Sequence, residues 1–139
     1  MPCVIYMHGN SSCRLEALDA VPYLLPQNIT VFCFDFAGCG KSDGEYISLG
    51  YHEKEDLNCV VEHLRKSGKV SLIGLWGRSM GAATALLHGH RDPSIAAMVL
   101  DSPVSSLKEL AQEIVYNNSK IPNFLTSMAL KMVRSSIRE

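Results

Sequence analysis

The sequence has no excess of either charge, and its few cysteines are not arranged in pairs. Lys and Arg number 13 against 14 Asp and Glu, so the net charge of -1 creates no global field that would attract nucleic acid or an anionic membrane. Its five cysteines form an odd set without a C-x-x-C pair, which argues against a disulfide framework and a zinc cluster. We expect free thiols, no metal and no other cofactor.

The N-terminus lacks the features of a leader or an anchor. It runs from Met1 directly into the apolar residues 4–7 without a basic n-region, and no segment is long and apolar enough to span a membrane. These absences predict a cytoplasmic protein without a transmembrane span. The sequence leaves the oligomeric state open.

What is present is the balance and rhythm of one globular α/β domain. Hydrophobic residues make up 47% and charged residues 19% of 139 positions, enough for one core. Short apolar runs predict four strands, over residues 4–7, 29–34, 70–76 and 95–100. Helical spacing predicts three helices between them, over residues 15–25, 51–66 and 79–88. This alternation predicts a parallel sheet, with the second and fourth strands at open edges.

Turn-forming residues set the expected limits of these elements. Pro22 should kink or interrupt the first helix, and Gly68 stands where a helix-ending glycine is expected after the second. Two further helical patterns follow residue 104. We therefore expect a single domain, with core elements over residues 1–104 and a helical cap or lid over residues 105–139.

A serine stands between two glycines at the end of the third predicted strand. The segment Gly77-Arg78-Ser79-Met80-Gly81 follows a buried strand and opens an Ala-rich helix, the context in which a G-x-S-x-G pattern forms a nucleophile elbow. Such a serine needs exposure, donors for an oxyanion and a base within reach. We expect Ser79 to attack a substrate carbonyl, with Gly77 and Gly81 allowing the tight turn. A strand-to-helix turn without chemistry is the alternative.

The loop after the first strand is predicted to complete an oxyanion hole. Gly9 lets the backbone approach the site, and the backbone N–H of Asn10 can point at the substrate oxygen together with that of Met80. His8 is then structural rather than catalytic. An ordinary loop with a serine helix cap is compatible with the same residues.

Three segments, in this order and spacing, resemble the α/β-hydrolase family, and within it the Bem46-like, acyl-protein thioesterase and serine aminopeptidase-like hydrolases. They are His8-Gly9-Asn10, the stretch from Asp35 to Ser42, and the elbow around Ser79, with Leu100-Asp101-Ser102-Pro103 as a weaker fourth. The resemblance implies a three-layer core with a mostly parallel sheet, of which four central strands are present. It also implies hydrolysis of an ester, thioester or amide in a small-molecule or acylated substrate.

The resemblance further implies an acid and then a histidine after Ser79 in the chain. If the four strands match the family's third to sixth, both would lie beyond Glu139, so we expect a partial chain. Asp101 is an alternative acid, since some lipase-like relatives take it from that strand. His88 and His90 lie roughly 13 to 16 Å along the helix from Ser79, at 1.5 Å per residue, and we expect them on the surface.

Two other functions stay open. Without its base the same scaffold would be an inactive fragment, or a non-catalytic protein that binds an acyl ligand or a partner. The run from Gly38 to Ser42 partly matches a phosphate-binding loop, but Asp35 replaces the first glycine and an acidic turn, residues 43–46, follows in place of a helix. A nucleotide site is therefore the weaker alternative.

Overall fold

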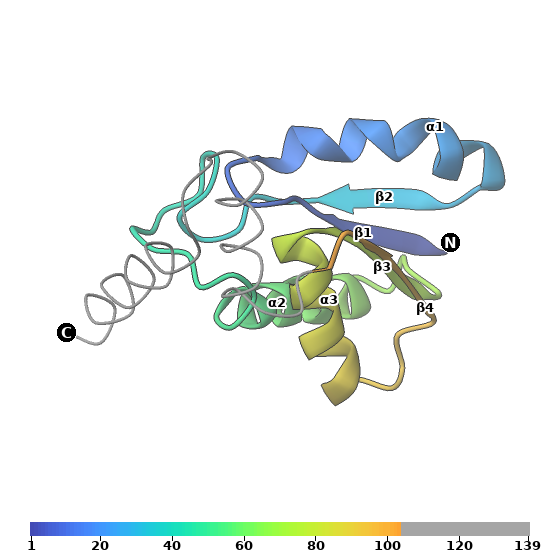
Figure 1. Cartoon of the computed structure of the whole chain (residues 1–139). Coiled ribbons are helices and arrows are strands. Elements are labelled where there is room, and N and C mark those ends of the chain that lie inside the picture. The colour runs from blue at the N-terminus through green and yellow to red at the C-terminus, as the bar shows by residue number, and fades with distance from the viewer. Residues whose placement is uncertain (104–139) are drawn as a thin grey trace. The chain divides into compact units, whose positions relative to one another are not determined.

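The computed structural model describes residues 1–103, which contain a sheet of four parallel strands (Figure 1). Strand β1 (Cys3–Met7) pairs with β2 (Thr30–Cys33) on one side and with β3 (Ile73–Arg78) on the other. Strand β4 (Ala97–Asp101) pairs with β3. The order β2-β1-β3-β4 makes β2 and β4 the edges of the described sheet, as the sequence predicted.

Helical segments cover both faces of this sheet (Figure 1). One face carries η1 (Arg14–Asp19), α1 (Val21–Leu24) and η2 (Leu25–Gln27). The other carries α2 (Glu53–Lys66) and α3 (Met80–Arg91). The three layers and the parallel sheet confirm the predicted fold class, whereas the predicted cap over residues 105–139 lies outside the described residues. No described helix has the length and apolar character needed to cross a membrane.

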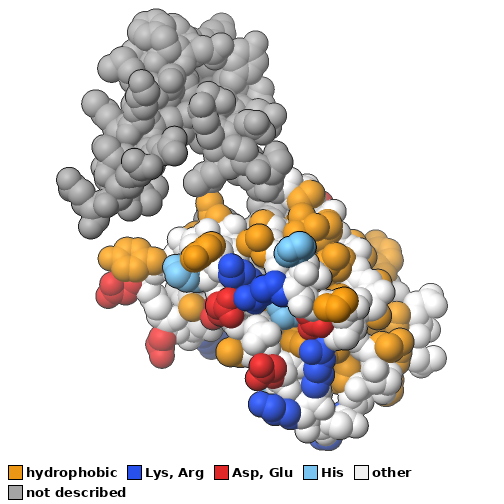
Figure 2. Space-filling view, turned by 90° about the horizontal axis from the view of Figure 1, so that it is seen from below, with side chains coloured by type: hydrophobic (Ala, Val, Ile, Leu, Met, Phe, Trp, Pro, Cys, Tyr) orange, Lys and Arg blue, Asp and Glu red, His pale blue; other side chains and the backbone are white. Residues whose placement is uncertain are grey.

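The larger core lies between the sheet and the helices α2 and α3. Side chains alternate along a strand, so Ile5 and Met7 of β1 point to the same face as Leu75 of β3. Figure 2 views the molecule from this side and shows Lys, Arg, Asp and Glu side chains over its outer surface. Beneath them is a buried cluster of Cys3, Ile5, Met7, Phe36, Leu57, Val61, Leu64, Ile73, Leu75, Met80 and Ala85.

The smaller core lies beneath η1 and α1. Tyr6 and Trp76 are paired in register on β1 and β3, and their ring centroids are 6.0 Å apart. Ala17 and Ala20 are the buried helical residues that pack against Tyr6. Small side chains thus bring this thin layer close to the sheet.

The predicted helix over residues 15–25 is wrong in detail, because two 3-10 segments flank one short α-helix. Pro22 is the second residue of this α-helix and does not interrupt a longer one. The backbone N–H groups of Tyr23 and Leu24 both donate to the carbonyl of Ala20, at 3.1 and 3.2 Å. Pro22 therefore occupies a first-turn position, where a missing N–H costs nothing.

Helix α2 confirms the prediction for residues 51–66 closely. Gly68 follows it with φ of 67°, in the left-handed conformation expected of a helix-ending glycine. At the other end, the buried carboxylate of Glu53 accepts the backbone N–H groups of Ser48 and Gly50, both at 2.8 Å. Burial pushes the pKa of Glu53 upward, but the hydrogen bonds from Ser48 and Gly50 outweigh it and hold this pKa below its ordinary value.

Candidate active site

Ser79 lies in a strained turn between β3 and α3. Its φ of 51° and ψ of −110° form a conformation that residues with a side chain rarely adopt. Its N–H donates to the carbonyl of Asp101 in β4 at 2.8 Å, and its own carbonyl accepts the N–H of Ala83 at 3.1 Å. The residue is half-buried. The fold therefore holds Ser79 at the carboxyl end of a central strand without sealing it from solvent.

Gly77 and Gly81 are required by this turn. A Cβ on Gly77 would overlap the carbonyl group of Gly81, and a Cβ on Gly81 would overlap the carbonyl group of Met7 in β1. The backbone of α3 therefore packs directly against the end of β1. Neither position has room for a side chain, which explains the glycine spacing seen in the sequence.

The loop after β1 lies beside this turn. A Cβ built on Gly9 would stand 3.7 Å from the Cβ of Ser79 and 3.6 Å from the carbonyl oxygen of Arg78, which is ordinary van der Waals contact. Asn10 is exposed in the turn that follows, and Met80 is the first residue of α3. The structure thus brings together the two segments that were assigned to one site from the sequence.

His8 is fully buried, and both of its ring nitrogens have partners. Its Nε2 accepts the N–H of Phe36 at 3.2 Å, and its Nδ1 lies 2.8 Å from the carbonyl oxygen of Gly9, which can only accept. These partners assign the ring proton to Nδ1. The ring also packs edge-on against Phe36, with centroids 5.1 Å apart. His8 therefore holds the loop after β1, and both of its ring nitrogens are engaged within the protein.

A carboxylate that the sequence analysis missed joins the loop to the turn. Glu16 of η1 accepts the hydroxyl of Tyr6 at 3.0 Å and, with both oxygens at 3.4 Å, the N–H of Gly9. Its Oε1 lies 3.9 Å from a guanidinium nitrogen of Arg78, and its side chain is 8% exposed. Burial and the charge of Glu16 raise the pKa of Tyr6, so the phenol stays protonated and donates. Glu16 lies in the 3-10 segment η1 and is not part of any motif of the sequence, so no local pattern marks it.

Asp101, the alternative acid, lies on the expected edge of the sheet. It is the last residue of β4 and pairs in register with Arg78, one position before Ser79. Its carboxylate accepts the hydroxyl of Ser102 at 2.9 Å, and no described histidine is bonded to it. Asp101 lines a cavity of about 470 Å³ on the α1 side with Tyr6, Leu18, Asp19, Ala20, Pro22, Tyr23, Trp76 and Arg78.

His88 lies at the far end of α3 from Ser79, but the prediction that it is a surface residue is wrong. It is 1% exposed, whereas His90 is exposed as predicted. Met80, Thr84 and His88 follow one another at intervals of four and share the buried side of the helix. That spacing was visible in the sequence and would have placed the ring inside.

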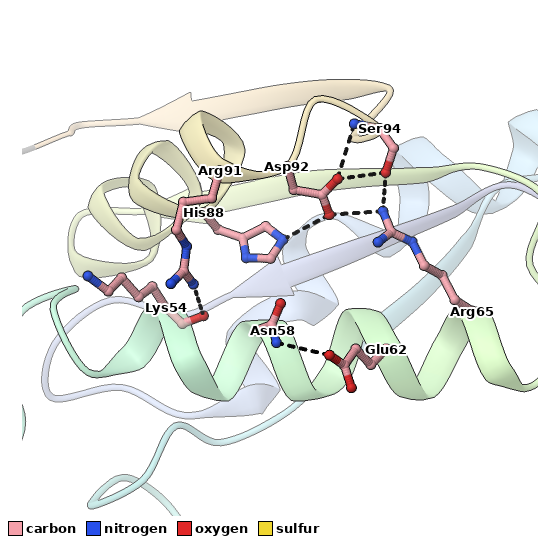
Figure 3. A network of polar contacts seen from close by, with 8 residues as sticks. All are labelled: Lys54, Asn58, Glu62, Arg65, His88, Arg91, Asp92 and Ser94. Carbon is pink, nitrogen blue, oxygen red and sulfur yellow. Dashed lines mark hydrogen bonds and ion pairs between the residues drawn. The ribbon is translucent and has the colours of Figure 1, made fainter.

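His88 belongs to a polar network between the end of α3 and α2 (Figure 3). Its Nε2 lies 3.3 Å from Oδ2 of Asp92, which also accepts Arg65 at 2.9 Å, while Oδ1 accepts the hydroxyl of Ser94 at 2.6 Å. The Ser94 hydroxyl is the main cause that lowers the pKa of Asp92 to about 2. Burial lowers the pKa of His88, which keeps the ring neutral. The network joins two helices and lies a full helix length from Ser79.

The partial phosphate-loop pattern folds around an internal carboxylate. Asp35 accepts the N–H of Lys41 at 3.0 Å, the N–H of Arg14 at 2.7 Å and the Arg14 guanidinium at 2.5 Å. The N–H of Ser42 donates to the carbonyl of Cys39, and α2 begins only at residue 53. These N–H groups are used within the protein, which argues against a nucleotide site. Across residues 1–103, no group of three metal-ligating side chains occurs.

Comparison with known proteins supplies relatives for this arrangement. The chain matches the family described as serine aminopeptidase, S33, over residues 2–136. It is 35% identical over 109 residues to the uncharacterized protein YqkD of Bacillus subtilis, an alignment that covers 76% of this chain and 36% of YqkD.

Solved structures share the fold as well. The Pyrococcus furiosus esterase Pf2001 matches with a TM-score of 0.77 and 33% identity, over 94% of this chain and 54% of the esterase. Est1E from Butyrivibrio proteoclasticus, solved with ferulic acid bound, matches with a TM-score of 0.69 and 26% identity, over 81% and 47% of the two chains. The chain thus spans between about a third and about half of the length of these relatives.

Proposed function

The chain belongs to the serine aminopeptidase S33 family of α/β-hydrolases, and from this membership we propose that it carries the nucleophile and oxyanion hole of a serine hydrolase. The observation that carries the proposal is the backbone of Ser79, with φ of 51° between two glycines that admit no side chain. Strain of this kind at a serine that solvent can reach is a feature of reactive sites. The bond cleaved is an ester, thioester or amide, and the similarity to Pf2001 favours an ester as the first substrate to test.

In this proposal the hydroxyl of Ser79 attacks the carbonyl carbon of the substrate. Negative charge then develops on the carbonyl oxygen, and the backbone N–H groups of Asn10 and Met80 donate to it. Met80 opens α3, so the positive end of the helix dipole adds to this stabilisation. His8 and Gly9 serve the site by holding the Asn10 loop beside the serine.

The hydroxyl of Ser79 also needs a base that accepts its proton. His8 has both nitrogens occupied, and His88 is buried at the far end of α3, so neither fits this role. Asp101 is the candidate for the acid that would orient such a base, because it ends β4 beside the turn. Oxyanion donors alone leave residual catalysis. We therefore expect this chain to react slowly and to be accelerated by an added base.

Labelling with a fluorophosphonate probe, with and without imidazole as the external base, tests the proposal. We expect the chain to be labelled, imidazole to increase the rate, and Ser79→Ala to abolish labelling. Ser102→Ala is the matched control, because Ser102 is an exposed serine at the same edge with φ of 51°. Its labelling should equal that of the parent chain, and labelling that persists in Ser79→Ala would show that the nucleophile was misassigned.

A non-catalytic role is the second candidate, favoured by the lack of any described histidine bonded to Ser79. In that case the scaffold binds an acyl ligand or a partner protein, and no labelling occurs even with imidazole. The five free thiols support a reducing, cytoplasmic location for either role.

A further inference from the structure

We propose that Glu16 is the positioning residue of the oxyanion loop, because its carboxylate contacts the strand before the loop, the loop itself and the elbow. These contacts are made by Tyr6, Gly9 and Arg78 respectively. Glu16 does not touch the reacting atoms. It determines where the N–H of Asn10 stands relative to Ser79, and this inference rests on the proposed function.

The sheet holds the carboxylate of Glu16 in place. Tyr6 belongs to β1, which pairs with a strand on each side, so its hydroxyl is a rigid reference point. That hydroxyl donates to Glu16 at 3.0 Å, and burial together with the charge of Glu16 raises the pKa of the phenol, which stays protonated. The acceptor is therefore tied to the centre of the fold rather than to a surface loop.

The carboxylate of Glu16 in turn orients the loop after β1. Both oxygens of Glu16 lie 3.4 Å from the nitrogen of Gly9, and a Cβ built on Gly9 would lie 4.0 Å from Oε2. With its N–H directed toward Glu16, the peptide plane before Gly9 is fixed. The following N–H, that of Asn10, is then the one left for the substrate oxygen.

The contacts by which Glu16 orients the loop depend on hydrogen bonding rather than on charge. The guanidinium of Arg78 is 54% exposed and 3.9 Å from Glu16, so water screens this ion pair and its contribution is small. The buried contacts to Tyr6 and Gly9 need an acceptor oxygen and not a charge. Glutamine supplies such an oxygen, whereas alanine does not.

Replacement of Glu16 should not unfold the segment that carries it. Arg14, two residues earlier, binds the carboxylate of Asp35 through its N–H at 2.7 Å and through its guanidinium at 2.5 Å. Ala17 and Ala20 pack into the smaller core independently of Glu16. The 3-10 segment η1 therefore keeps two other attachments to the sheet.

The test compares Glu16→Ala, Glu16→Gln and the control Asp19→Ala in the imidazole-assisted labelling of Ser79. Asp19 is an exposed carboxylate of the same 3-10 segment and makes no hydrogen bond within residues 1–103. We expect alanine at position 16 to slow labelling roughly 10- to 100-fold, the range that misplacement of a catalytic group produces. Glutamine should recover the rate to within about threefold, and Asp19→Ala should label at the parent rate. Equal rates for all variants, or no recovery with glutamine, would overturn the assignment.

Amide NMR spectra of the same variants separate this inference from the proposed function. If the parent chain is not labelled at all, the hydrolase proposal fails, but the contacts of Glu16 can still be examined. Shifts of the Gly9, Ser79 and Met80 amide signals in Glu16→Ala, absent in Glu16→Gln and Asp19→Ala, would support the positioning role. Unmoved Ser79 and Met80 signals in Glu16→Ala would refute it, because the loop would then keep its place without the carboxylate.

Discussion

The two faces of the sheet are covered by different kinds of layer. On one face, α2 and α3 are long helices whose buried residues interlock with β1 and β3 in the larger core. On the other, three short helical segments bury only Ala17 and Ala20 against Tyr6, while Leu18 and Tyr23 stay 63% and 71% exposed. The first layer supplies most of the apolar burial that stabilises the described fold. The second carries Glu16 and faces the cavity beside Asp101.

This difference separates stability from function within one small fold. Ser79 is attached to the well-packed face, because the turn that holds it begins α3 and its glycines touch β1. Glu16, which orients the loop beside Ser79, belongs to the face covered by η1, α1 and η2, here called the thin face. Substitutions of buried residues on the first face should therefore unfold the protein, whereas substitution of Glu16 on the second should alter reactivity with little loss of stability.

The largest effect on stability is expected for Gly81→Ala. The added Cβ would overlap the Met7 carbonyl group, and neither the strand nor the helix can move without opening the larger core. We expect a loss of about 4 kcal/mol or more in the free energy of unfolding, measured by urea denaturation. Gly89→Ala in the same helix is the control. Its Cβ meets the sulfur and the terminal methyl group of Met98, the end of a flexible side chain that can move, so a near-neutral change is expected.

A pair of leucine truncations compares the faces directly. Leu57 of α2 is fully buried, so Leu57→Ala removes its contacts and leaves a cavity, with an expected cost of about 3 kcal/mol. Leu18 of η1 is 63% exposed, and Leu18→Ala should cost less than about 0.5 kcal/mol. Urea denaturation measures both losses in the free energy of unfolding, and equal losses would contradict the difference between the two faces.

The same contrast explains what the sequence could predict. Helix α2 has an apolar stripe and a glycine stop, and the glycines around Ser79 have a local steric cause, so both could be inferred from neighbouring residues. The contacts of Glu16 with Arg78 and of Asp35 with Arg14 join segments far apart in the chain, and no spacing rule specifies them. His88 was misplaced because a polar residue at a helix end was taken for an exposed one, although its four-residue spacing from Thr84 indicated burial.

Acid should weaken the α2–α3 face through Asp92. Its pKa falls from 3.8 in the unfolded chain to about 2 in the fold, so its contribution is fully present above about pH 5 and is lost as the pH falls toward 2. The shift corresponds to about 2 kcal/mol. Urea denaturation between pH 2 and pH 7 should show this loss in the parent chain. Asp92→Asn should be less stable at pH 7 but flatter with pH, and parallel curves would contradict this role.

A small effect is expected for Pro22→Ala on the thin face, and its sign is informative. Pro22 occupies the first turn of α1, where its fixed φ suits the helix and restricts the unfolded chain. Replacement by alanine should therefore lower the free energy of unfolding by roughly 0.5 kcal/mol. If Pro22 instead interrupted one helix over residues 15–25, as its sequence context suggests, alanine would stabilise the protein by about 3 kcal/mol. Urea denaturation distinguishes the two signs, and stabilisation would mean that the thin layer is a long helix weakened by proline rather than a set of short segments.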